Sequence, residues 1–141
     1  MGVAIVKSFG SICAQVVEVE RQSDKKLKVK KVTSVMDCGM TVNLDTVKAQ
    51  TEGNVIMALQ AAFKGEITFK NGRAVEKNFD KYKMLRINET PEINVFVMDN
   101  EETPGGVGEP GLPPLAPALC NAIFDESKNR IRKLPFDLKM V

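Results

Sequence analysis

The chain has 141 residues, 43% of them hydrophobic and 27% charged, which is the composition of an ordinary globular domain. The interspersed charges sum to only +2, which argues against nucleic-acid binding. Histidine is absent, which excludes Ser-His-Asp and Cys-His nucleophile systems and histidine-ligated metal sites. We expect a single domain over residues 1–141, without a membrane span, whose proton chemistry falls to Asp, Glu, Lys, Tyr or Cys.

The first forty residues predict three strands. β-branched residues fill VAIVKSFGSICAQVVEVE and break at Gly10-Ser11, which indicates strands at 3–9 and 12–20. The polar stretch RQSDKK makes a turn. The alternation in LKVKKVTSVMDCG predicts a third strand that ends at Gly39, with a slip near Lys30-Lys31. Its expected inward residues are Leu27, Val29, Val32 and Val35.

Two residue types in this chain could suggest binding sites. The run KKLKVKK at 25–31 is the one basic cluster, and its alternation favours a strand with one solvated face over a phosphate-binding patch. Cys13, Cys38 and Cys120 lie far apart in no paired spacing. They predict buried free thiols rather than zinc ligands or a disulfide framework.

The apolar period changes after Asn43, a good N-cap residue. Apolar residues and one threonine then recur every three or four positions, which predicts a helix at 44–63. Asn71-Gly72 predicts a hairpin between two short β segments, and INVFVM at 93–98 predicts a strand. The expected buried stripe of the helix is Leu44, Val47, Thr51, Val55, Leu59 and Ala62.

The last third of the chain predicts a second helix. Pro113-Pro114 can stand at its start, and LAPALCNAIFDES gives about a dozen helical residues. Either Lys128 or Asn129 closes it, asparagine being the easier left-handed residue. NRIRKLPF is a short strand or an extended tail. The order of elements predicts an α+β fold: a mixed sheet with two main helices on one face.

The chain starts in an apolar strand without a polar lead-in. This start suggests a piece cut from, or split off, a longer chain. An edge or an apolar face would then be left open, and we expect the isolated chain to self-associate.

The stretch at 103–124, TPGGVGEPGLPPLAPALCNAIF, contains five of the seven prolines and a single carboxylate, Glu109. Gly105, Gly106 and Gly108 would allow positive φ and close backbone approach, with prolines fixing the flanks. Such a loop would suit a carboxylate held against a ligand or a reacting centre. From the residue pattern alone, a solvated loop acid is the favoured interpretation.

The same stretch, followed by RIRKLPF, resembles the C-terminal end of the molybdopterin-binding large subunit of the xanthine oxidase (molybdenum hydroxylase) family. It is most similar to the isoquinoline 1-oxidoreductase β-subunit type. FGSICAQVVEVE, VMDCGMTVNLDTVKAQTEG, FKNGRAVEKNFDKYKMLR and ETPEI resemble that family in the same order. The resemblance implies part of the molybdenum cofactor-binding domain fold, as a fragment or a naturally split subunit.

The resemblance also assigns site residues. Glu109 matches the glutamate of the family's Gly-Val-Gly-Glu motif, the general base that takes the proton of a molybdenum-bound hydroxyl. Gln50 matches a glutamine that hydrogen-bonds the pterin, and Gly108 is a further expected cofactor-binding position. No metal ligand is expected in this chain. Ala49 and Asn54 depart from family glycines, which puts local helix ends, rather than the site, in doubt.

Cofactor and partners are likewise implied by the resemblance. The cofactor is molybdopterin in its cytosine dinucleotide form. The partners are the remaining part of the subunit and an iron–sulfur subunit. The small-molecule substrate is an N-heterocycle or an aldehyde, which is hydroxylated with water-derived oxygen. The family's other pocket segments have no counterpart here, so the isolated chain should hold no cofactor and be inactive. The alternative is a non-catalytic interaction module that retains the fold. The compartment stays open between bacterial cytoplasm and periplasm.

Overall fold

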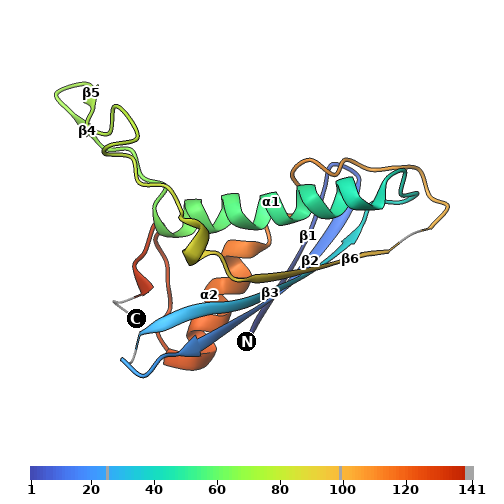
Figure 1. Cartoon of the computed structure of the whole chain (residues 1–141), viewed down its shortest axis with the longest axis horizontal. Coiled ribbons are helices and arrows are strands. Elements are labelled where there is room, and N and C mark those ends of the chain that lie inside the picture. The colour runs from blue at the N-terminus through green and yellow to red at the C-terminus, as the bar shows by residue number, and fades with distance from the viewer. Residues whose placement is uncertain (25, 99, 139–141) are drawn as a thin grey trace.

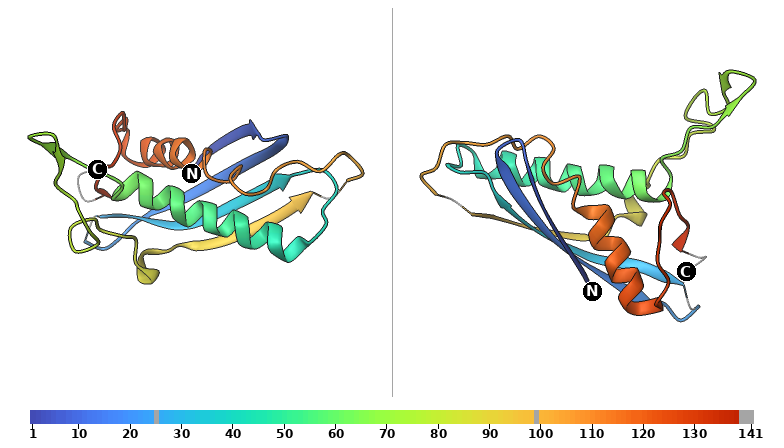
Figure 2. Two further views of the ribbon diagram at one scale, coloured as in Figure 1. Left: turned by 90° about the horizontal axis from the view of Figure 1, so that it is seen from above. Right: turned by 180° about the vertical axis from the view of Figure 1, so that it is seen from behind.

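A computed structural model describes residues 1–24, 26–98 and 100–138. Its main sheet has the strand order β1-β2-β3-β6, and both long helices lie on one face of it (Figures 1 and 2). The predicted α+β class is confirmed. The elements of this layer are β1 (Gly2–Ser8), β2 (Ser11–Arg21), β3 (Leu27–Asp37), α1 (Leu44–Phe63), β6 (Glu92–Met98) and α2 (Leu115–Ser127).

The first three strands form an antiparallel meander. β1 and β2 meet in a tight turn at Phe9-Gly10, where both residues have positive φ, 54° and 79°. Between β2 and β3 the register shifts, because Glu18 pairs with Lys31 whereas Val19 pairs with Val29. Lys30 is therefore the extra residue of a bulge, which explains the slip in the sequence alternation.

β6 joins the sheet as a parallel neighbour of β3, with Val32 opposite Ile93 and Met36 opposite Val97. A parallel pair needs a crossover, and α1 supplies it on the covered face. The start of α1 is set by Asn43, whose side chain accepts a 2.8 Å hydrogen bond from the Thr46 backbone amide. The helix occupies the predicted range.

The core lies between the sheet and the two helices, and it corrects two expectations. Val35 faces the opposite side of the sheet, because the bulge at Lys30 changes the alternation and turns Ser34 and Met36 inward instead. Leu44 is 47% exposed in the first turn of α1, so the buried stripe begins at Val47. The principal buried side chains are Val17, Leu27, Val29, Val32, Val55, Leu59, Leu115, Leu119 and Ile123.

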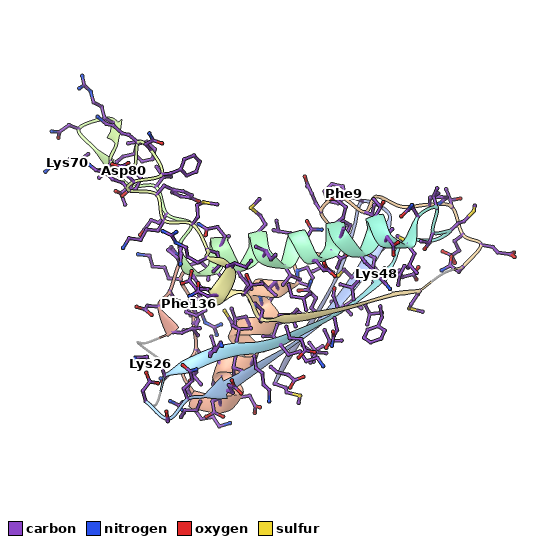
Figure 3. All side chains as sticks on the ribbon, viewed as in Figure 1. Phe9, Lys26, Lys48, Lys70, Asp80 and Phe136 are labelled. Atoms are coloured by element: carbon purple, nitrogen blue, oxygen red, sulfur yellow. The ribbon has the colours of Figure 1, made fainter. Side chains whose placement is uncertain are left out.

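The connection from α1 to β6 projects from the body as an arm, residues 66–83 (Figure 1). Its tip is the predicted hairpin, β4 (Phe69–Lys70) and β5 (Arg73–Ala74), with φ of 52° and 72° at Asn71 and Gly72. The side chains of Lys70 and Asp80 lie far from the sheet (Figure 3). A 3₁₀ turn, η1 (Ile87–Glu89), leads back to β6.

The lysine run is solvated, as predicted. Lys28 and Lys30 are exposed, and Lys30 lies 3.7 Å from the Glu20 carboxylate. Lys31 is 3.4 Å from Glu92 on β6. These pairs give alternating charge across β2, β3 and β6 rather than a phosphate-binding patch, although Lys25 lies outside the described residues.

The residue that closes α2 differs from the one that residue preferences favour. Lys128, not the easier Asn129, takes the left-handed conformation (φ 61°) that closes α2. Its ammonium donates to the Asp125 carbonyl (2.6 Å), a contact that asparagine could not make from this position. Beyond it the described residues form an extended tail without a strand, held where the Phe136 amide donates to the Ala62 carbonyl (3.0 Å; Figure 3).

Two glycines test this packing in opposite directions. Gly39 has φ +71°, and an added Cβ would lie 2.5 Å from the Thr103 carbonyl oxygen. We predict that Gly39→Ala lowers the free energy of unfolding of the isolated chain by about 2 kcal/mol. Gly53 lies in α1 with no neighbouring element within 4 Å, so Gly53→Ala should raise it by about 0.5–1 kcal/mol. Urea unfolding followed by circular dichroism measures both, and equal midpoints for the two variants would contradict the structure.

Candidate functional site

The loop that carries Glu109, residues 103–112, lies against the turns at one end of the sheet. The Gly105 amide donates to the Cys38 carbonyl (2.8 Å), and the Gly106 amide donates to the Phe9 carbonyl (2.7 Å). Phe9 marks this end of the molecule in Figure 3. The loop is therefore attached by its backbone to both the β1–β2 turn and the end of β3.

Glycine is required in this loop because of close packing. A Cβ at Gly105 would lie 2.3 Å from the Ser11 hydroxyl oxygen, and one at Gly106 would lie 3.0 Å from the Phe9 Cβ. The expected close approach is thus confirmed. The expected positive φ is wrong for Gly105, Gly106 and Gly108, since the positive-φ glycines of this end are Gly10 and Gly39 in the adjoining turns. The loop itself runs extended over those turns.

Two side chains of β2 support the loop from below. The Ser11 hydroxyl donates to the Gly106 carbonyl, and the Gln15 amide donates to the Gly111 carbonyl, each at 2.7 Å. Ser11 and Gln15 are buried on the same face of the strand, and the two carbonyls flank Glu109 on either side. Sequence reasoning missed both, although polar residues on an otherwise apolar inward face were the available signal.

Glu109 itself is exposed. Its carbonyl accepts from the Leu112 amide (2.9 Å) in a turn, and the next residue, Pro110, is buried. The backbone on both sides is therefore held while the carboxylate points out of the loop.

Gln50 lies on the same side of the molecule. It is exposed on α1 beside Thr51, and Thr51 and Asn54 pack against Gly111, two residues after Glu109. A Cβ added at Gly108 would meet no neighbour within 4 Å among the described atoms. The three predicted site residues, Gln50, Gly108 and Glu109, are all exposed, and Gln50 precedes the residue of α1 that packs against the Glu109 loop.

Two buried polar side-chain atoms around the loop, one on α1 and one on β2, lack a hydrogen-bond partner among the described residues. Asn54 Nδ2 and Gln15 Oε1 are buried without a partner, and a Cβ at Gly111 would be 3.3 Å from that Asn54 nitrogen. Leaving such groups unpaired costs about 1–3 kcal/mol each. Asn54, at a position where the resemblance expects glycine, therefore packs against the loop while its Nδ2 makes no hydrogen bond to it. The side-chain hydrogen bonds to the loop come from Ser11 and Gln15.

Cys13 lies beneath the loop, in a buried cluster that Val107 of the loop packs against. Burial raises the pKa of its thiol, and the weaker influence of hydrogen bonds with Ser34 and Gln15 acts in the opposite direction. A raised pKa keeps the thiol protonated at neutral pH, and only the thiolate is a good nucleophile. Cys13 and Cys38 are buried and Cys120 is half-buried, all three as free thiols.

Within the described ranges, no three or more Cys, Asp or Glu side chains gather closely enough to hold a metal ion. A pocket of about 540 Å³ lies on the arm, beside Lys70, Arg73 and Lys81. No helix in the described parts of the chain is both long and apolar enough to cross a membrane.

The molybdopterin cofactor-binding domain model matches residues 6–91, more than half of the chain. The matched range contains β2, β3 and α1 of the α+β layer. The chain belongs to the molybdopterin cofactor-binding domain family.

Two curated relatives illustrate the match. The isoquinoline 1-oxidoreductase subunit beta of Brevundimonas diminuta is 33% identical over 96% of this chain and 17% of its own length. A membrane-bound aldehyde dehydrogenase of Gluconacetobacter polyoxogenes is 37% identical over 87% of this chain and 16% of its own. This chain therefore spans about a sixth of each. The second relative is named for pyrroloquinoline quinone rather than molybdopterin.

Solved structures share the fold. Quinoline 2-oxidoreductase from Pseudomonas putida 86 matches 89% of this chain and 17% of its own with a TM-score of 0.76 and 19% identity. The aldehyde oxidoreductase from Desulfovibrio gigas matches 89% of this chain and 14% of its own with a TM-score of 0.73 and 20% identity.

The β2 supports should control the mobility of the glutamate loop. Ser11→Ala and Gln15→Met each remove one hydrogen bond to the loop, worth about 0.5–1.5 kcal/mol, and Gln15→Met also removes longer contacts with Cys13 and Ser34. We predict that amide hydrogen exchange at Gly106 and Leu112 becomes about three- to tenfold faster. The control is Thr68→Val on the arm, which loses a 3.0 Å bond to Glu76 and should leave the loop unchanged. Loop exchange that is unaltered in folded Ser11 and Gln15 variants would show that the backbone contacts suffice.

Proposed function

We propose that this chain is the C-terminal part of the molybdopterin-binding subunit of a molybdenum hydroxylase, and that it supplies Glu109 as general base together with one wall of the cofactor pocket. The observation that carries the proposal is the contrast at Glu109. The backbone on both sides of it is hydrogen-bonded to β2 and to the turns, while its carboxylate is exposed. Family membership and the oxidoreductase relatives support it.

The residues present fit one side of such a cofactor. Gln50 offers an exposed amide that can both donate and accept, as hydrogen bonds to a pterin ring require. Gly108 leaves room for close approach, because no described atom occupies the space where a side chain would stand. The bound cofactor would supply the electron acceptor and water activation. We infer the cytosine dinucleotide form from the resemblance to the isoquinoline oxidoreductase type.

Glu109 would accept the proton that hydroxylation with water-derived oxygen releases. A positioned carboxylate can act as general base, and this chain contains no histidine to do so. The bonds from Ser11 and Gln15 would keep the carboxylate in place during that step. The substrate is proposed to be an N-heterocycle or an aldehyde, because the names of the relatives include isoquinoline, nicotinate and aldehyde. An iron–sulfur subunit is the proposed electron-transfer partner.

The isolated chain should bind no molybdenum. Gln50, Gly108 and Glu109 are all exposed in this chain, so a cofactor would be held from one side only. We predict less than about 0.05 molybdenum per chain after expression in a molybdenum-replete host, measured by elemental analysis. Stoichiometric molybdenum would overturn the proposed one-sided pocket. Bound pyrroloquinoline quinone, detected by its absorbance after extraction, would instead assign the cofactor named for the Gluconacetobacter relative.

Glu109→Gln tests the general base in the complete enzyme that contains this chain. Glutamine keeps the shape of the side chain but cannot take a proton, so reduction of the enzyme by substrate should slow by about 10²–10⁴-fold. Cofactor content should stay near that of the wild type. The matched control is Glu101→Gln, another exposed acid of the same connection, which should reduce at the wild-type rate.

Stopped-flow reduction and metal analysis on the same sample separate the alternatives. A Glu109 variant that keeps its cofactor and reduces within a few-fold of wild type would place the base elsewhere. No molybdenum in the wild-type assembly itself would favour the non-catalytic interaction module.

A further inference from the structure

The outer face of the sheet, opposite the helices, has an apolar half. The strand register places Ile5, Ala14, Val35 and Phe96 in one row across all four strands. Among these, Ile5 is 68% exposed and Phe96 is 59% exposed. No described helix, strand or loop covers this face (Figure 2). The apolar half consists of this row and the row on either side of it, in which eight of the twelve outward residues are apolar: Val3, Ile5, Ile12, Ala14, Val16, Val35, Phe96 and Met98. The other four outward residues are Lys7, Thr33, Asp37 and Asn94.

The other half of the same face is charged. Along β2 the outward residues change from Ile12, Ala14 and Val16 to Glu18 and Glu20. β3 and β6 change in the same direction, and cross-strand ion pairs join Lys30 to Glu20 and Lys31 to Glu92 at that end. A face that is solvated throughout is polar throughout. The outer face of the sheet therefore has one charged part, which is readily hydrated, and one mainly apolar part, which would be stabilised by contact with a partner.

The apolar half lies at the end of the sheet that holds the candidate site. The Phe9-Gly10 turn and the end of β3 close the sheet there, and the Glu109 loop is attached to both. Apolar exposure continues around this end through Phe9, 64% exposed, Met40, 51%, and Val42, 88%. Between these turns and the middle of the face lies a row in which Lys7 and Asp37 alternate with Ile12 and Met98.

The area of the apolar half indicates its occupant. Four strands about 4.8 Å apart and three rows about 6.8 Å apart give roughly 400 Å². A stable complex between separate proteins buries about 800 Å² on each partner, so a second copy of this chain stacked on the face would bury too little. A protein domain that is covalently linked to the chain, or that contacts it over further surfaces as well, does not need to bury 800 Å² at this patch alone. The Brevundimonas relative has such a body, because the matching segment is 17% of its length.

We propose that the apolar half of the outer sheet face is the docking surface for the remaining part of the molybdopterin-binding subunit. This inference rests on the proposed function, because that function supplies the missing body. The charged half of the face stays in solvent beside the interface, as the polar rim of an interface does. Self-association of the isolated chain is then a weak substitute for the native contact.

The test is a cysteine footprint. The matching 136 residues of the Brevundimonas subunit are replaced by this chain, and single cysteines report on both halves of the face. Ile5→Cys and Phe96→Cys lie in the apolar half, and Lys28→Cys in the charged half is the matched control. All carry Cys120→Ala, while buried Cys13 and Cys38 remain as unreactive references. Maleimide labelling is measured peptide by peptide in the isolated chain and in the chimaeric subunit.

We expect the Ile5 and Phe96 reporters to label at least tenfold more slowly in the chimaera than in the isolated chain, and the Lys28 reporter to change less than about threefold. Equal rates at Ile5 and Phe96 in both would overturn the proposal. Protection that arises in the isolated chain and increases with its concentration would overturn it in favour of a second copy.

A second variant, Phe96→Lys, is tested in both the isolated chain and the chimaera in case the cysteine substitutions lower the yield of the chimaera. It should leave the urea midpoint of the isolated chain unchanged and lower the yield of soluble chimaera several-fold, whereas Lys28→Glu should change neither. An unchanged yield with Phe96→Lys would also overturn the proposal. Molybdenum content of the same chimaera is assayed separately, so that a protected face without molybdenum would contradict the proposed function and leave the docking surface standing.

Discussion

The pairing of β2 with the Glu109 loop is the constraint on which the candidate site depends. Ser11 and Gln15 reach carbonyls on either side of the glutamate, and the Ser11 bond requires glycine at 105, where a Cβ would lie 2.3 Å from the Ser11 hydroxyl oxygen. The glycines of the loop and the polar residues of the strand are therefore two parts of one arrangement. The result is a fixed backbone that presents an unburied carboxylate, and such a fixed position is what general-base catalysis requires.

The second constraint is that a sheet has two faces and this chain covers one. Both helices pack on the face that carries Val17 and Val32, and their crossover position follows from the parallel pairing of β3 with β6. The opposite face is left with an apolar half beside the candidate site. Site and uncovered surface lie at the same end, which is consistent with a segment completed by a larger body there. The proposed division of labour places the base on this chain and the rest of the pocket on that body.

Family membership and residue roles rest on different observations. The family follows from a match over residues 6–91, and the solved structures at 19–20% identity show the fold alone. Glu109 lies outside residues 6–91, so its role depends on the Gly-Val-Gly-Glu resemblance and on the geometry of its loop. The relative named for pyrroloquinoline quinone makes the identity of the cofactor a matter for direct measurement.

The sequence by itself determined the local elements of this protein. Alternation placed the strands, the slip at Lys30-Lys31 marked the bulge, Asn43 started α1 and Asn71-Gly72 made the hairpin, because each depends on neighbours within a few residues. Only the tertiary structure decided that β6 runs parallel to β3, that Val35 faces outward and that Ser11 and Gln15 support the glutamate loop. Those features join residues as much as 96 positions apart, and no local pattern encodes which distant carbonyl a buried side chain will meet.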